Sequence, residues 1–516
     1  MDANATPRKT TATARDRLVA VCPLVTAVLL CLCLTTPAAV VCCWVALVPF
    51  GLSLAARRVP RATFAAAYLA GFAVHLVGMS WVLDCYRYEN RWGPYLFEWF
   101  WIGVYGGLLL VFTLAVGRTI FQRLRVPMMI LLPSLWVSFE IVRQELAGWI
   151  VGIDFPWLKL GTALIESPRL VQQADLGGEF LLTLFVAFIN GSVLDLSMAT
   201  YRHRKLRFAH LLPRVTVAGV VILAATGYGE WRLDQIESSE GPNVCLLGEI
   251  DLPPILPVER LYENFPQDSD ASQRGHLVLW PELAYHHPIV DAASDSPDLG
   301  RQYLEETAQR LQATLVIGCE HQIDSARYNA VACVDPEGSF LGCYDKRSLV
   351  PGVEDDVGAA YAPGRSAGVF RLSTPQAVYH FGAAICYDLC FSAHFRELRQ
   401  EAYGTRGVDF FVQSGAEGQD RDDVLADWML RYARLRAVEN RRPLVRNATL
   451  GHSALIDGNG TVRKILPTTP IEAPTWFGAI PLDKRFSLYA VAGDWVGGLC
   501  LTTLGVLLTL SRPARG

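Results

Sequence analysis

Long apolar segments near the two ends of the chain constrain its fold more than any other feature. Of the 516 residues, 51% are hydrophobic and only 19% are charged, and the apolar residues concentrate in these segments. A helix that crosses a bilayer core needs about 20 predominantly apolar residues. We therefore predict a polytopic α-helical membrane protein with about eight spans. The predicted spans are Leu18–Leu34, Ala38–Ala56, Ala62–Leu83, Leu96–Gly117, Pro127–Ala147, Gly178–Met198, Val215–Trp231 and Leu488–Leu510.

The first predicted span, Leu18–Leu34, follows several basic residues, which is also typical of a signal peptide. No convincing small-x-small cleavage site follows it, and another apolar segment begins within a few residues. We therefore expect this helix to be retained.

Basic residues are unevenly distributed between the predicted loops. Cytoplasmic loops of membrane proteins carry an excess of Lys and Arg. If the N-terminus is cytoplasmic, the basic loops all fall inside. This predicts that both termini are cytoplasmic and that residues 232–487 lie on the outer side of the cytoplasmic membrane. The basic residues concerned are Arg57, Arg58, Arg61, Arg118, Arg123, Arg125, Arg202, Arg204, Lys205, Arg207, Arg512 and Arg515.

The positions of the spans divide the chain into three predicted parts. Residues 1–231 form a transmembrane domain of about seven helices, residues 232–487 an extracytoplasmic domain, and residues 488–516 a last span with a cytoplasmic tail. In the middle part, short apolar runs alternate with helical patterns, which is typical of an α/β domain. The predicted strands are Val244–Leu247, His276–Trp280, Thr314–Cys319, Asn329–Val334, Phe340–Tyr344, Val378–Ile385, Val408–Val412, Leu444–Ala448 and Ala454–Asp457, with helices at Asp298–Gln312 and Asp422–Arg441.

The second of these predicted helices carries apolar and basic residues on different faces. An apolar stripe runs along one face, and we expect it to be core rather than a substrate site. The stripe consists of Leu425, Trp428, Tyr432 and Leu435, while Arg434, Arg436 and Arg441 lie off it.

Three residues able to carry chemistry follow predicted strands: Glu282, Lys346 and Cys386. A thiol needs a base to become a thiolate, and an acyl group under attack needs a cation or N–H groups where negative charge develops. A glutamate and a lysine meet these two needs. A single cysteine in an apolar strand is more often a packing residue. The three residues together indicate a thiol enzyme that transfers acyl groups or hydrolyses amides.

Charge and cysteine spacing argue against other functions. A formal net charge of −4, without a basic and aromatic groove, argues against nucleic-acid binding. No pair among the 13 cysteines has convincing zinc-ligand spacing, so we expect no metal site. We interpret Cys386 and Cys390 as a nucleophile and a packed neighbour. An oxidising compartment would permit disulfides between outer cysteines, but the sequence alone cannot pair them.

The segments around the three residues resemble the nitrilase (carbon–nitrogen hydrolase) superfamily. They read Trp280-Pro281-Glu282, Tyr344-Asp345-Lys346 and Ile385-Cys386-Tyr387-Asp388, in that order. The resemblance implies a four-layer αββα sandwich in which Glu282, Lys346 and Cys386 converge. Because about seven spans precede this domain and one follows it, the chain resembles a membrane-embedded branch of the superfamily, the apolipoprotein N-acyltransferases.

Motifs outside these segments support the second resemblance. Trp136, Glu140 and Arg143 resemble the family's Trp-x-x-x-Glu-x-x-Arg, and Phe155–Gly161 resembles its Phe-Pro-Trp-x-x-x-Gly. Since Glu140 and Arg143 lie near the end of a predicted span, we expect an ion pair between them at the membrane edge. Further matches are Leu349-Val350-Pro351 followed by Glu354, and the stretch Arg434–Pro443.

The family resemblance implies a function for the chain. It would transfer an acyl chain from a membrane phospholipid to the N-terminal amino group of diacylglyceryl-cysteine in an apolipoprotein, through a thioester on Cys386 and without a cofactor. Glu282 would be the general base, and Lys346 would stabilise the oxyanion. We expect the enzyme to be a monomer.

Three more residues are expected to support the reaction. Glu354 either orients Lys346 as a second carboxylate, as the family implies, or is a solvated loop acid. Tyr387 and Asp388 are expected to shape the turn that carries the nucleophile.

Four departures from the family pattern leave two alternatives open. Asp388 stands where Glu is usual, and residues 351–354 read Pro-Gly-Val-Glu instead of Pro-Phe-Gly-Glu. The stretch Gln413–Glu417 replaces an Asn-Asp-x-Trp-Phe sequence, and Leu252–Arg260 lacks the usual Trp. The alternatives are a membrane-anchored amidohydrolase of the nitrilase type and a catalytically silent scaffold. Because the three reactive residues are intact, acyl transfer is the preferred hypothesis.

Overall fold

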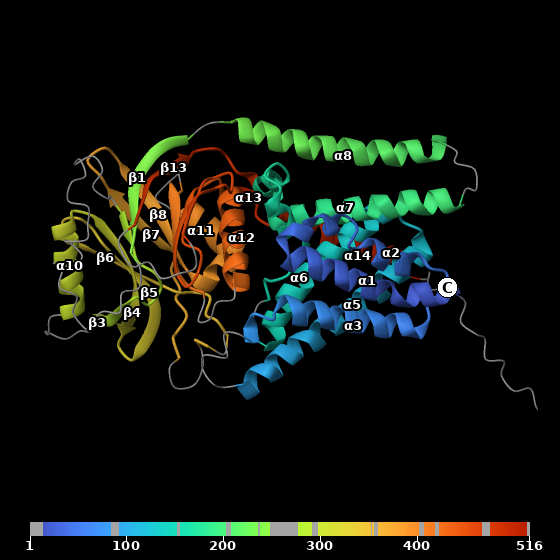
Figure 1. Ribbon diagram of the computed structural model, residues 1–516, viewed down its shortest axis with the longest axis horizontal. Coiled ribbons are helices and arrows are strands. Elements are labelled where there is room, and N and C mark those ends of the chain that lie inside the picture. Colours follow the sequence, from blue (N-terminus) through green and yellow to red (C-terminus); the bar gives the residue numbers. More distant parts are fainter. Residues whose placement is uncertain are drawn as a thin grey trace, which may run out of the picture.

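The chain forms a bundle of apolar helices beside an α/β domain of two stacked sheets, as the computed structural model in Figure 1 shows. The structure describes residues 14–83, 92–151, 155–202, 208–235, 238–247, 277–291, 298–351, 353–354, 360–401, 407–417, 423–466 and 475–512. Some predictions lie outside the described residues. They concern Arg204, Lys205, Arg207, Leu252–Arg260, His276, Gly352, Asp422 and Arg515.

Long apolar helices build most of the bundle. Within the residues that the structure describes, five helical stretches are long and apolar enough to cross a membrane: Asp16–Thr35, Arg61–Gly78, Leu96–Leu124, Leu170–Thr200 and Leu211–Asp234. The long helices of the bundle are α1 (Ala14–Thr35), α3 (Arg61–Gly78), α5 (Trp92–Leu124), α6 (Met128–Val151), α7 (Ala174–Arg202) and α8 (Phe208–Asp234).

Two predicted spans are not single helices. The segment predicted at Ala38–Ala56 consists of a 3₁₀ helix, η1 (Pro37–Trp44), and a short helix, α2 (Val48–Ala55). Pro49 lies in the first turn of α2, where the missing N–H of proline is tolerated. The segment predicted at Leu488–Leu510 is divided into α13 (Leu488–Ala492) and α14 (Trp495–Leu510), because Gly493 between them has a φ of 62°.

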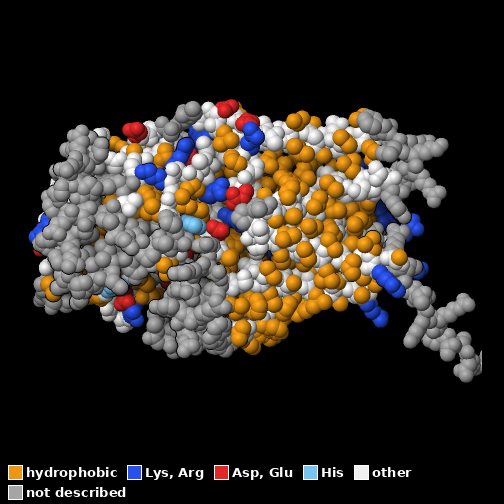
Figure 2. Space-filling view, viewed as in Figure 1, with side chains coloured by type: hydrophobic (Ala, Val, Ile, Leu, Met, Phe, Trp, Pro, Cys, Tyr) orange, Lys and Arg blue, Asp and Glu red, His pale blue; other side chains and the backbone are white. Residues whose placement is uncertain are grey.

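The surface of the bundle is apolar. Figure 2 shows hydrophobic side chains over most of the bundle, with Lys and Arg side chains at the end away from the sheets. Large apolar side chains are exposed there, including Phe112 (63%) and Leu223 (72%). Since such a surface is costly in water but suited to lipid, this part of the chain belongs in a membrane.

Two sheets form the middle of the α/β domain. The seven-stranded sheet has the order β13-β1-β2-β4-β5-β6, with β3 paired to β4, and the six-stranded sheet has the order β12-β11-β10-β9-β8-β7. The strands of the first are β1 (Ser238–Leu246), β2 (Leu277–Leu279), β3 (Tyr285–Asp291), β4 (Thr314–Ile323), β5 (Ala326–Val334), β6 (Phe340–Asp345) and β13 (Thr475–Asp483). Those of the second are β7 (Gly368–Ser373), β8 (Val378–Ile385), β9 (Phe410–Ala416), β10 (Leu444–Thr449), β11 (Ala454–Ile456) and β12 (Val462–Ile465).

Helices cover the outer faces of both sheets. Helix α10 (Leu299–Leu311) lies on the seven-stranded sheet, while α11 (Ser392–Glu401) and α12 (Asp423–Asn440) lie between the six-stranded sheet and the bundle (Figure 1). The predicted αββα sandwich is confirmed. Strands β3, β7, β12 and β13 were not predicted. In β3 and β12 the side chains are largely exposed or half-buried, so they lack the continuous apolar run on which the prediction relied.

The core of the α/β domain continues into the bundle. Apolar side chains of the two sheets face each other in one cluster, and a second cluster joins the seven-stranded sheet to α10. A third cluster runs from the outer face of the six-stranded sheet through α12 to the helices of the bundle. The side chains on the predicted α12 stripe join the two regions, because Trp428 and Tyr432 both contact Trp157 of the Phe-Pro-Trp motif. The stripe is therefore core, as predicted.

Of the arginines off this stripe, Arg436 and Arg441 are buried and Arg434 is half-buried. Arg436 contacts Glu439 of its own helix and Glu179 of α7, while Arg434 reaches Glu166 of the 3₁₀ helix η2 (Leu160–Glu166). Arg441 donates to Asp175 Oδ2 of α7 at 2.8 Å. This family motif therefore ties the α/β domain to the bundle.

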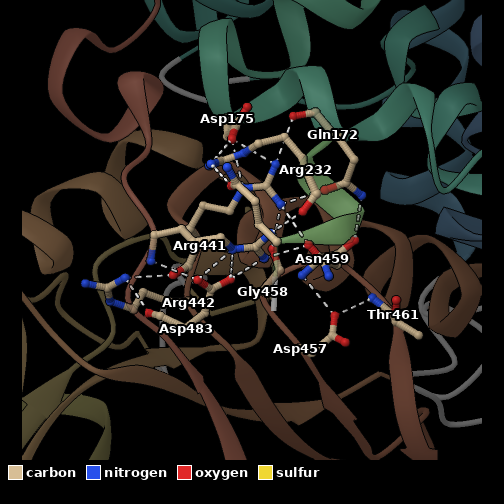
Figure 3. A network of polar contacts seen from close by, with 12 residues as sticks. Gln172, Asp175, Arg232, Arg441, Arg442, Asp457, Gly458, Asn459, Thr461 and Asp483 are labelled. Atoms are coloured by element: carbon tan, nitrogen blue, oxygen red, sulfur yellow. Dashed lines mark hydrogen bonds and ion pairs between the residues drawn. The ribbon is translucent and has the colours of Figure 1, made fainter. Parts of the chain in front are cut away.

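A polar network surrounds Arg441 at this junction (Figure 3). Its guanidinium donates to Gln172 Oε1 at 2.6 Å, to the Gly458 carbonyl at 3.1 Å and to Asn459 Oδ1 at 3.1 Å. Arg232 of α8 pairs with the same Asp175 carboxylate at 2.5 Å. Since Gln172, Asp175, Arg232 and Arg441 are buried, the network is stabilising only while these members are all present.

The predicted ion pair between Glu140 and Arg143 is wrong. Each binds the connection after α6 instead: Glu140 Oε1 accepts from the Leu160 N–H at 2.7 Å, and Arg143 donates to the Trp157 carbonyl at 2.6 Å. Glu140 Oε2 also accepts from Thr183 at 2.8 Å. Backbone groups of Trp157 and Leu160 thus take up the two side chains that the sequence suggested would pair with each other.

Candidate active site

Glu282, Lys346 and Glu354 converge at one edge of the sandwich. Glu282 follows β2, and Lys346 directly follows β6. The Lys346 ammonium lies 2.9 Å from Glu282 Oε1 and 2.8 Å from Glu354 Oε2. All three side chains are buried, and the nearby 3₁₀ helix η4 (Cys386–Cys390) brings Cys386 to the end of β8. The structure thus brings together residues that are far apart in the sequence.

The backbone before Glu282 packs tightly against β4. A Cβ atom at Gly318 would lie 2.1 Å from the Pro281 carbonyl oxygen, so only glycine allows this approach. The Glu282 carboxylate then accepts hydrogen bonds at both oxygens. Asn329 donates to Oε1 at 2.7 Å, and the Ala416 N–H donates to Oε2 at 2.9 Å.

Electrostatics favour a base at Glu282 and a cation at Lys346. Burial raises the pKa of Glu282, although Lys346 opposes this and Glu354 adds to it. Burial alone would lower the pKa of Lys346, but the Glu282 and Glu354 carboxylates outweigh it and raise that pKa well above its usual value. Lys346 is therefore held as a cation between two carboxylates.

Glu354 is not a solvated loop acid. It is buried, and besides Lys346 it accepts from Asn329 at 2.6 Å and from the Val350 N–H at 2.7 Å. Asn329 donates to both Glu282 and Glu354, so one amide group holds the two carboxylates on either side of Lys346.

Cys386 sits in a strained turn. Its φ is 40°, in the left-handed region that non-glycine residues seldom adopt and that is often found at active sites. The half-buried thiol contacts the Ala416 carbonyl at 3.8 Å. Burial raises the pKa of the Cys386 thiol well above its usual value, and Glu282 adds to this while Lys346 opposes it. The resting thiol is therefore neutral and needs a base.

Asp388 shapes the turn that carries the thiol, as the sequence suggests. Its carboxylate accepts from the Ile385 N–H at 3.0 Å, from the Ser348 N–H at 2.9 Å and from the Tyr344 hydroxyl at 2.7 Å. Asp388 therefore links the turn that carries Cys386 to residues on both sides of Lys346. Tyr387 instead stacks on Trp157, with ring centroids 6.0 Å apart.

Several polar residues at the site were missed in the sequence. Ser414 donates to the Trp280 carbonyl at 2.8 Å, and Asn447 donates to the Leu279 carbonyl at 2.7 Å, so both hold the segment that leads to Glu282. Glu417 and Arg446 form a buried pair beside them. These four residues lie within apolar strands or directly after one. A polar residue in such a place indicates that it has a buried partner, but the sequence does not identify that partner.

Metal-ligand clusters are absent from the part of the chain that the structure describes, where no group of three or more His, Cys, Asp or Glu side chains is placed to hold an ion. The cysteines of this part carry free thiols.

Two families match the chain. Residues 26–192 match the family described as "Apolipoprotein N-acyltransferase N-terminal domain", and residues 268–483 match the family described as "Carbon-nitrogen hydrolase". The first match covers most of the helical bundle, and the second covers the segment that contains Glu282, Lys346 and Cys386.

Curated relatives match along most of their length. A protein named apolipoprotein N-acyltransferase from Geobacter metallireducens is 26% identical over 96% of this chain and 95% of its own length. One of the same name from Vibrio cholerae is 25% identical over 78% of this chain and 79% of its own. Among solved structures, an amidase from Nesterenkonia sp. is 19% identical with a TM-score of 0.36, covering 48% of this chain and 92% of its own.

Proposed function

The chain belongs to the apolipoprotein N-acyltransferase family, and from that premise we propose that it transfers an acyl chain from a membrane phospholipid to the N-terminal amine of a diacylated apolipoprotein. The observation that carries this proposal is the placement of the Glu282–Lys346–Glu354 cluster and the Cys386 thiol on a domain whose core is continuous with an apolar helical bundle. A lipid donor explains why a nitrilase-type domain is joined to such a bundle.

The first half-reaction acylates Cys386. Glu282 takes the proton of the thiol, and the sulfur attacks the ester carbonyl carbon of the phospholipid. Lys346 stabilises the negative charge that develops on the carbonyl oxygen. The ester C–O bond then breaks, Glu282 returns the proton to the departing lysophospholipid hydroxyl, and a thioester remains on Cys386.

The second half-reaction releases the acyl chain to the acceptor. The α-amino group of the diacylglyceryl-cysteine attacks the thioester carbonyl, and Glu282 takes a proton from the amine. The C–S bond breaks, the thiolate regains that proton, and an amide forms. Because an ester is already an activated acyl donor, this reaction requires neither nucleotide nor metal.

The proposed location of the reaction is the outer face of the bacterial inner membrane. We assign residues 1–231 and 488–516 to the membrane and residues 232–487 to a periplasmic catalytic domain, in a monomer with both termini inside. A periplasm-active reporter fused after Gln376 should be active, and one fused at Gly516 should be silent. The opposite pattern contradicts this topology.

The proposed transfer is tested with purified protein, phosphatidylethanolamine and a diacylated lipopeptide. Mass spectrometry of the peptide should find a third acyl chain, and Cys386→Ala should abolish it. The same domain type also occurs in hydrolases. If the wild type forms no such product with common phospholipids but releases ammonia from simple amides, it is an amidohydrolase.

A further inference from the structure

A further buried acid, Glu417, lies beside the candidate active site but has no part in the mechanism above. It follows the end of β9, and its side chain pairs with Arg446 of β10. Both side chains have 0% exposure. A buried ion pair seldom adds net stability to a protein, so stability alone does not explain why this pair lies beside the site.

Arg446 binds a residue within β9 in addition to Glu417. It lies opposite Gln413 in the parallel pairing of β9 and β10, and its Nε donates to Gln413 Oε1 at 3.1 Å. The Glu417 N–H also donates to the Thr449 carbonyl at 3.1 Å. The backbone on both sides of Ala416 is therefore held from β10.

The backbone of Ala416 contacts two of the proposed reacting groups. Its N–H donates to Glu282 Oε2 at 2.9 Å, and its carbonyl accepts the Cys386 thiol at 3.8 Å. A displacement of Ala416 would therefore disturb two contacts at once: the hydrogen bond from its N–H to Glu282 and the contact of its carbonyl with the Cys386 thiol.

We propose that Glu417 and Arg446 are positioning residues for acyl transfer, because their ion pair fixes the Ala416 backbone that aligns Glu282 with Cys386. The proposal rests on the function proposed above and deepens it. It also gives a role to Gln413–Glu417, the stretch that departs from the family pattern.

The charges around Glu417 support this role. Burial raises the pKa of Glu417 to about 7, and the negative charge of Glu282 raises it further. The positive charge of Arg446 lowers this pKa most strongly, and His452 also lowers it. His452 itself lies 3.1 Å from Asp427 of α12. Negative charge on Glu417 contributes to the raised pKa of Cys386, after burial and Glu282. Removing that charge should therefore make the thiol easier to ionise.

The test compares Glu417→Gln and Glu417→Asp with the wild type in three measurements. The first is the single-turnover rate of thioester formation with labelled phosphatidylethanolamine. The second is the pH dependence of Cys386 alkylation by iodoacetamide, located by peptide mass spectrometry, which needs no lipid. The third is the thermal unfolding midpoint at pH 8. Glu305→Gln, which removes an acid paired with Arg301 on α10, is the control.

The expected pattern separates positioning from folding. Glu417→Gln should slow thioester formation at least tenfold and shift the alkylation midpoint to lower pH. Because Arg446 loses its buried partner charge, the unfolding midpoint should also fall, while the variant stays folded and its Cys386 stays reactive at the assay temperature. Glu417→Asp keeps the charge but not the reach, so it should slow thioester formation with alkylation near the wild-type midpoint. Glu305→Gln should change nothing.

Two results would overturn the proposal. One is a thioester rate in Glu417→Gln within twofold of the wild type. The other is a loss of thioester formation and alkylation together with a lowered unfolding midpoint, which indicates a structural role only. If the wild type forms no thioester with lipid, the proposed function fails. The positioning role is then judged by alkylation alone, and it fails if the pH dependence of Cys386 alkylation in Glu417→Gln equals that of the wild type.

Discussion

The candidate active site and the junction around Arg441 are both clusters of buried charge, but they differ in what is left reactive. At the junction, Arg441 donates to a carboxylate, an amide and a backbone carbonyl, all at 2.6 to 3.1 Å. At the site, the carboxylates are similarly held, but the Cys386 sulfur has a long contact of 3.8 Å in a turn with a φ of 40°.

This difference teaches that buried charge does not by itself mark a catalytic group. A fully bonded cluster stabilises one arrangement of two regions. A cluster that holds a base and a cation beside a strained, weakly bonded nucleophile can instead do chemistry. Substitutions in the two clusters should therefore have different signatures, one in rate and the other in stability.

The largest effect is expected at the nucleophile. Cys386→Ala should reduce acyl transfer roughly 10⁴-fold or more, because no other group can form the thioester. In-gel detection of enzyme labelled by a tagged phospholipid measures this, with circular dichroism to check that the variant is folded. Labelling that persists would place the nucleophile elsewhere.

Lys346→Ala should reduce thioester formation by about 10²- to 10³-fold, because it removes the cation at the developing oxyanion. It also leaves Glu282 and Glu354 buried without their shared partner. We therefore expect a lower unfolding midpoint as well, unlike Cys386→Ala. Wild-type rates in Lys346→Ala would show that backbone N–H groups alone stabilise the oxyanion.

Arg441→Met should act on stability and not on chemistry. It leaves Asp175 with one cation fewer in a buried site, which we expect to lower the free energy of unfolding by about 3–5 kcal/mol. Arg463→Met is the matched control: that side chain is 56% exposed and pairs with Asp457, so its loss should cost about 0–1 kcal/mol. Denaturation in detergent measures both. Equal effects would mean that the Arg441 network does not hold the junction.

The smallest effect is a pH dependence. Glu282 acts as a base only when ionised, and burial raises its pKa above the ordinary value of 4.5. The rate of thioester formation should therefore fall as the pH decreases, beginning at a higher pH than for an ordinary glutamate. A pH–rate profile of single-turnover acylation tests this. A rate independent of pH down to 4.5 would exclude Glu282 as the base.

Local patterns in the sequence predicted the parts of this protein that depend on near neighbours. Apolar segments indicated a membrane bundle, and alternating apolar runs and helical patterns indicated the α/β domain. The ordered Glu282, Lys346 and Cys386 segments indicated the αββα sandwich through their resemblance to a family. These features could be predicted from the sequence because hydrophobic periodicity and strand-end motifs are properties of short stretches.

Contacts between distant segments were decided only by the tertiary structure. Glu140 binds the Leu160 N–H and not Arg143, and Asn329 joins Glu282 to Glu354. Neither contact leaves a local signal, because a buried polar group can be satisfied by any donor or acceptor that the fold brings near. The same holds for Arg441 and Asp175, which lie on opposite sides of the junction. The sequence by itself thus indicated the apolar bundle, the αββα sandwich and the candidate residues Glu282, Lys346 and Cys386, while the packing of bundle against sandwich decided the partners of the buried polar groups.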